Sequence, residues 1–272
     1  MNAPSQPSAS AGTSGVFRQQ RLRQTTTSNS PAKPQRCCLD LNQLASTNHE
    51  AIHFEVQIVI PDTHPYWHLR SIVERSAEVA AVPFSYYAYT PQTVEDRRSS
   101  FIMSVEQFLD EAEVYRVMEG AGQGRELAVH SDLLMRDGRR LHLVMVDMST
   151  SARAHLEKLR SFLGDNFFQR ISWYASGRSF HGYGDSLLER EEWVQFMGLL
   201  LLANQPRLEP TVDPRWIGHR LLAGYASLRW TCNTSHYLTL PRRIEVLGRA
   251  RVGKLQVGPI ARNLPKVPEP RS

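Results

Sequence analysis

Residues 125–148 read RELAVHSDLLMRDGRRLHLVMVDM, and this stretch decides the fold class. Two apolar runs flank the pair Asp137-Gly138, and an Asp-Gly pair between such runs is a strong signal of a tight hairpin turn. The pattern therefore predicts two strands, at 125–135 and 140–148, which pair in the antiparallel direction. A sheet with at least one hairpin follows from this segment alone.

The residues on either side of this hairpin predict an α+β fold. Alternating apolar residues indicate strands, and apolar residues three and four positions apart indicate helices. Strands are expected at 53–60, 84–89, 167–175 and 228–232, with further short strands up to about 257, and helices at 66–82, 105–118, 151–163 and 188–203. We expect Ser104 to cap the second helix and Gly164 to end the third. No repeat is evident, and the ordered part reads as one unit.

The two ends of the chain differ in composition from the middle. Residues 1–45 are rich in Ser, Thr, Gln, Pro and Ala and lack apolar periodicity. Such a segment buries too little surface to offset the entropy of ordering it. We therefore expect 1–45 to be a disordered basic tail, 46–260 to be a single domain, and 261–272 to be a Pro-rich basic tail.

The formal net charge of +5 is unevenly distributed along the chain. Residues 1–50 carry a surplus of three positive charges and residues 241–272 a surplus of six, which leaves the middle at −4. Basic tails suit a polyanionic partner, because each phosphate that they neutralise releases a counterion. They also suit a protein whose tails only keep it in solution, and composition does not separate these two hypotheses.

Some classes of protein are not indicated by the sequence. The longest apolar run, residues 197–203, is far shorter than the roughly 18 residues that a membrane span needs. The N-terminal residues lack the apolar run of a secretory signal. Cys37, Cys38 and Cys232 form no CxxC pair, so neither a disulfide framework nor a zinc site is expected. We expect a cytoplasmic protein with reduced thiols and no membrane partner.

Three segments carry polar side chains at or beside the ends of predicted strands, where a rigid scaffold meets an open loop. Asp147 follows four apolar residues, so its carboxylate needs a partner such as a divalent cation; alternatively it caps the helix near Ser151. Residues 173–183 (WYASGRSFHGY) form a turn with Arg, Ser and His side chains suited to phosphate, and Gly177 lets a ligand approach the backbone. A plain surface turn is the alternative interpretation of that segment.

The third segment, residues 212–237, combines one carboxylate with several hydrogen-bond donors. Asp213 comes first, and Arg220, Arg229 and Asn233 follow it. Arg229 lies between two apolar residues of a predicted strand, which indicates a charge that is held in place for a purpose. The alternative is a structural ion pair between Asp213 and one of the arginines.

The order of these segments resembles the archaeo-eukaryotic primase superfamily, which includes primase-polymerases and the replication primases of plasmids and phages. In that family an Asp-x-Asp or Asp-x-Glu motif at a strand end precedes a Ser-x-His motif in a strand-turn, and a further Asp leads into segments with Arg and Asn. The corresponding residues are Asp147-Met148-Ser149, then Ser179-Phe180-His181, then Val212-Asp213 with Arg220, Arg229 and Asn233. The resemblance covers roughly residues 140–240. It implies a primase-like core of mixed or antiparallel sheets with an RRM-like half, flanked by helices.

The resemblance also implies a function, namely template-dependent nucleotidyl transfer of the DNA primase or primase-polymerase type. Asp147 and Asp213 would hold two Mg²⁺ or Mn²⁺ ions and would form the catalytic set together with His181. The nucleotide-binding set would be Ser176, Gly177, Arg178, Ser179, His181, Arg220, Arg229 and Asn233. The aromatic residues Tyr86, Tyr87 and Tyr89 either stack on the template or belong to the core.

The partners implied by the family are an NTP or dNTP and a single-stranded DNA template. The sequence shows no helicase P-loop of the GxxxxGK[ST] type. A separate helicase or replication initiator is therefore expected beside this chain, in the replication of a plasmid, phage or other mobile element.

One departure from the family pattern bears on activity. Ser149 stands in the second acidic position of the first motif, and a hydroxyl is a much poorer metal ligand than a carboxylate. Either another acid replaces it, with Asp132, Asp185 and Glu126 as candidates, or the protein is a catalytically reduced relative that binds nucleotide or nucleic acid in a regulatory or replication-accessory role. A third hypothesis is an unrelated α+β domain in which the order of the motifs is a coincidence. Asp147, His181 and Asp213 lying far apart in the fold would exclude the first two hypotheses.

Overall fold

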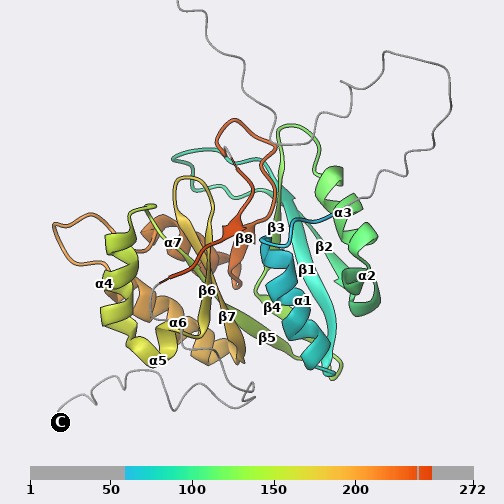
Figure 1. Cartoon of the computed structure of the whole chain (residues 1–272), viewed down its shortest axis with the longest axis horizontal. Helices are drawn as coiled ribbons and strands as arrows, with labels where there is room; N and C mark the ends of the chain where they lie inside the picture. The colour runs from blue at the N-terminus through green and yellow to red at the C-terminus, as the bar shows by residue number, and fades with distance from the viewer. Residues whose placement is uncertain (1–58, 238, 247–272) are drawn as a thin grey trace, which may run out of the picture. The chain divides into compact units, whose positions relative to one another are not determined.

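An antiparallel sheet forms the centre of the computed structural model, which describes residues 59–237 and 239–246, all within the unit Arg36–Ser272 (Figure 1). The strands are β1 (Val79–Tyr87), β2 (Arg98–Ser104), β3 (Glu126–His130), β4 (Asp132–Met135), β5 (Arg140–Asp147), β6 (Ile171–Ala175), β7 (Phe180–Leu188), β8 (Ser227–Arg229) and β9 (Arg242–Arg243). The helices are α1 (Pro65–Arg75), α2 (Val105–Leu109), α3 (Glu111–Gly120), α4 (Arg153–Leu163), α5 (Asp165–Phe168), α6 (Arg190–Leu202) and α7 (Pro214–Ala223). The predicted α+β class is confirmed.

Within the described residues the sheet has nine strands in the order β8-β3-β1-β4-β5-β7-β6-β9, with β2 paired to β1. Every pairing between these strands is antiparallel. The predicted hairpin at Asp137-Gly138 joins β4 to β5. Gly138 has a φ of +85°, a backbone conformation that residues with a Cβ rarely adopt. The turn residues therefore account for this strand pair.

Strand β1 connects the two parts of the sheet. One edge of β1 pairs with β2 along residues 81–87, and the other edge is shared by β3 and β4, which are consecutive in the chain. Ser131 separates β3 from β4: its N–H donates to the Ala226 carbonyl at 2.8 Å, and its hydroxyl accepts from the Ala226 N–H at 2.9 Å. The single strand predicted at 125–135 is thus two strands, and the segment that leads into β8 is tied to the break between them.

The structure corrects several predicted boundaries. The helix expected at 66–82 ends at Arg75, and the residues from Val79 onward belong to β1. The residue before a proline is disfavoured in a helix, and Pro83 follows this segment. The helix expected at 105–118 is two helices, because Asp110 ends α2 and caps α3 through its carboxylate. The strand expected at 167–175 begins with α5, and β2, β7 and α7 are not among the predicted elements.

Other local predictions are confirmed or fall outside the described residues. Ser104 caps α2 by accepting from the Gln107 N–H at 3.3 Å, while the Gln107 side chain accepts from the Ser104 N–H at 2.9 Å. Helix α4 ends at Gly164, and α6 occupies most of the helix expected at 188–203. The strand at 53–60 (apart from its last two residues), the strands after 246 and the tail boundaries near 45 and 260 lie outside the described residues.

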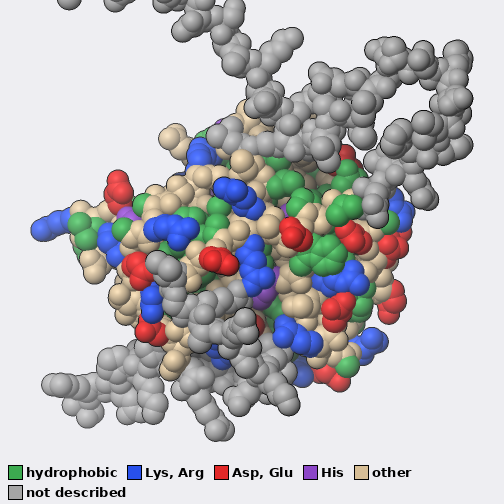
Figure 2. Space-filling model, viewed as in Figure 1, with side chains coloured by type: hydrophobic (Ala, Val, Ile, Leu, Met, Phe, Trp, Pro, Cys, Tyr) green, Lys and Arg blue, Asp and Glu red, His purple; other side chains and the backbone are tan. Residues whose placement is uncertain are grey.

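Basic and acidic side chains are interspersed on the face of the molecule in Figure 2. The visible part of that face therefore presents no large area of a single charge. No helix in the described ranges is both long and apolar enough to span a membrane.

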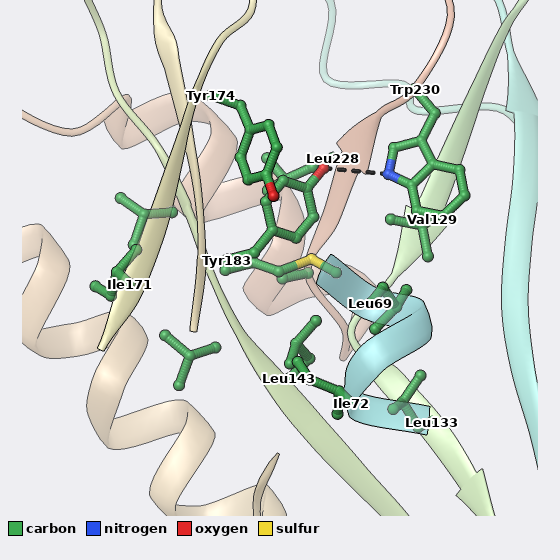
Figure 3. Packing of buried hydrophobic residues seen from close by; sticks show 14 of the residues in the cluster. Leu69, Ile72, Val129, Leu133, Leu143, Ile171, Tyr174, Tyr183, Leu228 and Trp230 are labelled. Atoms are coloured by element: carbon green, nitrogen blue, oxygen red, sulfur yellow. Dashed lines mark hydrogen bonds between the residues drawn. The ribbon is translucent and has the colours of Figure 1, made fainter. Parts of the chain in front are cut away.

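The apolar core fixes the strands that carry the polar motifs. Leu69 and Ile72 of α1 are buried over the sheet, close to residues of β4 and β5 (Figure 3). On β7, Tyr183 is fully buried, and its hydroxyl accepts a hydrogen bond from the Trp230 indole N–H at 3.3 Å. Side chains two apart on a strand lie on the same face of the sheet, so Tyr183 and His181 share a face of β7. The buried Tyr183 therefore fixes the orientation of the face on which His181 lies.

Candidate active site

The first two polar motifs meet through the register of two neighbouring strands. In the β5–β7 pair, Asp147 lies directly opposite His181. The distance from His181 Nε2 to Asp147 Oδ1 is 3.8 Å, and the Ser179 hydroxyl donates to the same carboxylate oxygen at 3.2 Å. A one-residue slip would place the two side chains on opposite faces of the sheet, so the register itself builds this contact.

The third motif joins the other two through backbone bonds. Met148 and Val212 form an isolated antiparallel bridge, and the Asp213 N–H donates to the Asp147 carbonyl at 2.9 Å. Asp147, His181 and Asp213, which are far apart in sequence, all line one cleft of about 420 Å³. A wide separation of these residues would have excluded both primase-like hypotheses, and the geometry instead brings them together.

The carboxyl group of Asp147 lies in an unfavourable electrostatic position. Burial and, second to it, the negative charge of Asp213 raise the pKa of Asp147 to about 8. The hydrogen bond from Ser179 and the positive charge of Arg229 act in the opposite direction. Two neighbouring carboxylates in such a site are stabilised by a cation bound between them.

The imidazole of His181 is neutral around pH 7. Burial lowers its pKa well below the ordinary value, and the positive charge of Arg229 lowers it further. Its Nδ1 atom is buried and has no hydrogen-bond partner among the described residues. A buried polar atom without a partner is uncommon in native structures, and His181 is one of the residues that line the cleft.

The turn at residues 176–179 presents hydroxyl groups to the cleft. The Ser176 hydroxyl and N–H both donate to the Ser179 carbonyl at 3.0 Å, and the two hydroxyl oxygens are 2.9 Å apart. Gly177 has a φ of +104°, which only glycine adopts without strain. Ser176, Arg178 and Ser179 line the cleft, whereas Gly177 shapes the turn without lining it.

Arg229 is a fixed positive charge at the base of the cleft. Its Nη2 donates to the Ser176 carbonyl at 2.6 Å, its Nη1 donates to the carbonyls of Thr231 and Thr239, and its guanidinium lies 4.1 Å from the centre of the Tyr237 ring. Its Nε is buried and has no hydrogen-bond partner among the described residues. The sequence expectation of a charge held in place is therefore met, with backbone carbonyls as the anchors.

The carboxylates of Asp147 and Asp213 are the candidate ligands for a divalent cation in the cleft. Asp213 caps α7, where its Oδ1 accepts from the N–H groups of Arg215 and Trp216 at 2.8 and 3.1 Å, and the carboxylate retains further acceptor capacity. Within the described part of the chain no group of three or more His, Cys, Asp or Glu side chains has the arrangement of a metal site. Mg²⁺, however, is commonly held by one or two carboxylates together with substrate phosphates and water. Asp147 and Asp213 provide such a pair.

The sequence model of the archaeo-eukaryotic primase 1D-like family matches residues 104–242, about half of the chain. The chain belongs to this family. No curated protein and no solved structure matches it. The matched region of this primase-like chain contains all three motifs, whereas α1, β1 and most of β2 precede it.

None of the three acids considered as substitutes for Ser149 reaches the cleft of this primase-like chain. Asp132 pairs with Arg140 at 2.6 Å, Asp185 pairs with Arg170 at 3.0 Å, and Glu126 accepts from the backbone and hydroxyl of Thr234. None of them lines the cleft. The Ser149 hydroxyl itself donates to the Pro210 carbonyl. Glu95 and Asp96 also line the cleft, but among the described residues no group of three or more acidic side chains is arranged to hold a metal ion. The second position of the family's acidic motif is therefore left without a carboxylate.

The remaining predicted residues divide between the cleft and its surroundings. Arg220, Tyr87 and Tyr89 line the cleft. Asn233 does not line it, and its backbone carbonyl accepts from the Gly124 N–H at 3.3 Å. Tyr86 belongs to the core side, where its hydroxyl donates to the Val117 carbonyl at 2.8 Å.

Sequence reasoning missed the loop between β1 and β2, residues 88–97, which forms one wall of the cleft. Glu95, Asp96 and the following Arg98 line the cleft, as does Arg215 at the start of α7. The only signal in the sequence is the charged run Glu95-Asp96-Arg97-Arg98, which by itself reads as a solvated surface loop.

Proposed function

We propose that this chain catalyses template-dependent nucleotidyl transfer of the DNA primase or primase-polymerase type. The observation that carries the proposal is the pairing of Asp147 with His181 across β5 and β7, with Asp213 bonded to the same backbone. The family assignment supports primase-like nucleotidyl transfer in general. The arrangement of these three side chains in one cleft supports the specific roles given to them below.

Asp147 and Asp213 would hold Mg²⁺ or Mn²⁺, which when bound would stabilise the charge that develops on the transferred phosphoryl group. His181, the hydroxyl of Ser179 and the exposed guanidinium of Arg178 line the cleft and would contact the triphosphate. Arg229 contributes a fixed positive charge beneath them. The reaction is attack of a primer 3′-hydroxyl on the α-phosphorus, with pyrophosphate as the leaving group.

The same proposal includes an NTP or dNTP and a single-stranded DNA template as ligands. The proposal also includes a separate helicase or initiator, a cytoplasmic location and the replication of a mobile element. Only the family resemblance supports these three parts of the proposal. Tyr89 is exposed at the cleft and is the aromatic side chain best placed to stack on a base.

Ser149 favours a second candidate function, a reduced site that binds nucleotide without turning it over efficiently. Its hydroxyl is already bonded to the Pro210 carbonyl, and among the described residues no group of three or more His, Cys, Asp or Glu side chains is arranged to hold a metal ion. A protein of this kind would bind nucleotide or nucleic acid in a regulatory or replication-accessory role.

The deciding experiment is primer synthesis on single-stranded DNA with labelled nucleotides and Mn²⁺ or Mg²⁺. Product that disappears in both Asp147→Asn and Asp213→Asn supports the transferase; the second change keeps an N-cap residue, so loss of α7 would not explain the result. Asp185→Asn is the control, because it removes a paired carboxylate outside the cleft. No product, combined with nucleotide binding that depends on His181, would favour the reduced site instead.

A further inference from the structure

Two buried arginines in the cleft share one carboxylate. Arg98, the first residue of β2, donates through Nε to both carboxylate oxygens of Asp96 at 2.8 and 2.9 Å. Arg220, on α7, also donates to Asp96. The Arg220 side chain is 2% exposed and that of Arg98 is 11% exposed, so both guanidinium groups depend on this carboxylate for their charge compensation. All three residues line the cleft.

The two guanidinium groups are held in place without Asp96. Arg98 donates through Nη1 to the buried hydroxyl of Ser85 at 3.1 Å and lies 4.2 Å from the centre of the Tyr87 ring. Arg220 donates through Nη1 to the buried hydroxyl of Ser227 at 2.8 Å. Both hydroxyls belong to strands of the sheet. The scaffold therefore presents the remaining N–H groups of both arginines to the cleft in a fixed geometry.

Asp96, in contrast, lies on an exposed loop. Its neighbours Glu95 and Arg97 form a pair at 2.8 Å whose side chains are 65% and 87% exposed. The loop is tied to α7 by a bond from Arg215 to the Thr93 carbonyl at 2.9 Å. One carboxylate faces two guanidinium groups, so the cluster has a net positive charge. An anion that carries more negative charge than one carboxylate would compensate this cluster more completely.

We propose that Arg98 and Arg220 form a phosphate subsite of the cleft, and that Asp96 occupies this subsite as an internal counter-anion which a phosphate group of the ligand displaces. Phosphate oxygens accept from arginine in the same forked geometry as a carboxylate and carry more charge. The subsite rests on the proposed function in that the ligand carries phosphate, but it requires neither Asp147 nor Asp213. Asp96 and Arg98 also precede residues 104–242, so the family match does not assign this role.

The test is calorimetric binding of inorganic tripolyphosphate, and separately of a short single-stranded DNA, to the full chain and to two variants. Asp96→Asn removes the charge of the competitor and keeps its shape, so we expect binding to tighten about tenfold or more, the size expected for releasing a charge-assisted pair. Asp185→Asn removes the charge of a paired carboxylate that lies outside the cleft, so its affinity should equal that of the wild type. Tightening for tripolyphosphate alone assigns the subsite to the nucleotide tail, and tightening for DNA alone assigns it to the strand backbone.

Three results would overturn the proposal: unchanged or weaker binding by Asp96→Asn, equal tightening by Asp185→Asn, or no binding of either ligand by any form. Hydrogen exchange in the wild type gives a test that needs no variant to fold. Tripolyphosphate should speed exchange of the amides at residues 88–97 as Asp96 is released, and unchanged or slower exchange would contradict displacement. Primer synthesis is not a readout here, so a chain that makes no product can still meet these expectations.

Discussion

Replacing Asp147 by Asn is expected to stabilise the fold and to abolish its response to divalent cations. Burial and the charge of Asp213 raise the pKa of Asp147 to about 8, whereas an aspartate in an unfolded chain titrates near pH 4 (about 3.9). Between these values the folded protein binds one more proton than the unfolded chain. The contribution of Asp147 to the free energy of unfolding therefore falls as the pH rises through that window, by at most about 1.4 kcal/mol per pH unit.

The size of the effect at pH 7 follows from this slope. About three pH units separate pH 7 from the titration of the unfolded chain, which gives an upper value of about 4 kcal/mol. The Asp147 side chain is 21% exposed, so water relieves part of the cost, and we expect Asp147→Asn to raise the free energy of unfolding by roughly 2–4 kcal/mol. The amide oxygen of Asn still accepts from Ser179, so this hydrogen bond is not lost.

Urea unfolding between pH 5 and about pH 8.5, with and without Mn²⁺, measures both effects. In the absence of metal the wild type should lose stability relative to Asp147→Asn as the pH rises, and Mn²⁺ should restore it. The buried histidines whose pKa values are lowered (His64, His130, His142 and His181) change the stability of both proteins alike, so the difference between the two profiles reports Asp147. Asp185→Asn, a change in an ion pair outside the cleft, should leave both responses in place. Parallel pH profiles for the wild type and Asp147→Asn, or a less stable Asn variant at pH 7, would refute the reasoning.

Three further predictions concern the site and its scaffold. Asp213→Asn should keep near wild-type stability, whereas Asp213→Ala should lose about 1 kcal/mol with the cap of α7, and both should lose primer synthesis; equal stability of the two variants in urea unfolding would contradict the capping role. Ser149→Asp should increase primer synthesis in Mn²⁺ if the missing carboxylate limits the rate, and an unchanged rate would show that one ion suffices. Gly184→Ala should lower the free energy of unfolding by about 1–3 kcal/mol, because the new Cβ would lie 2.6 Å from the Cβ of Val144. Gly198→Ala has open space on α6 and should raise the free energy of unfolding by up to about 1 kcal/mol. The reverse order of the two variants in thermal unfolding would contradict the packing of β5 on β7.

Local chemistry was enough to predict several elements correctly. The hairpin at Asp137-Gly138, the cap at Ser104 and the end of α4 at Gly164 each depend on the backbone preferences of a few adjacent residues. Where a segment was compatible with two structures, the prediction was wrong. Residues 79–82 are apolar and fit either a helix or a buried strand, and only pairing with β2 and β4 makes them part of β1.

The sequence by itself determined the α+β class, the order of the three motifs and the absence of an acid at Ser149. Only the tertiary structure decided that Asp147, His181 and Asp213 share one cleft, since strand register and a backbone bond between distant segments bring them together. The tertiary structure also decided that Asp132, Asp185 and Glu126 are committed elsewhere and that Asp96 compensates Arg98 and Arg220. The physical reason is that turn and cap preferences act between neighbouring residues, whereas the partner of a buried charge is set by whichever segment the sheet places beside it.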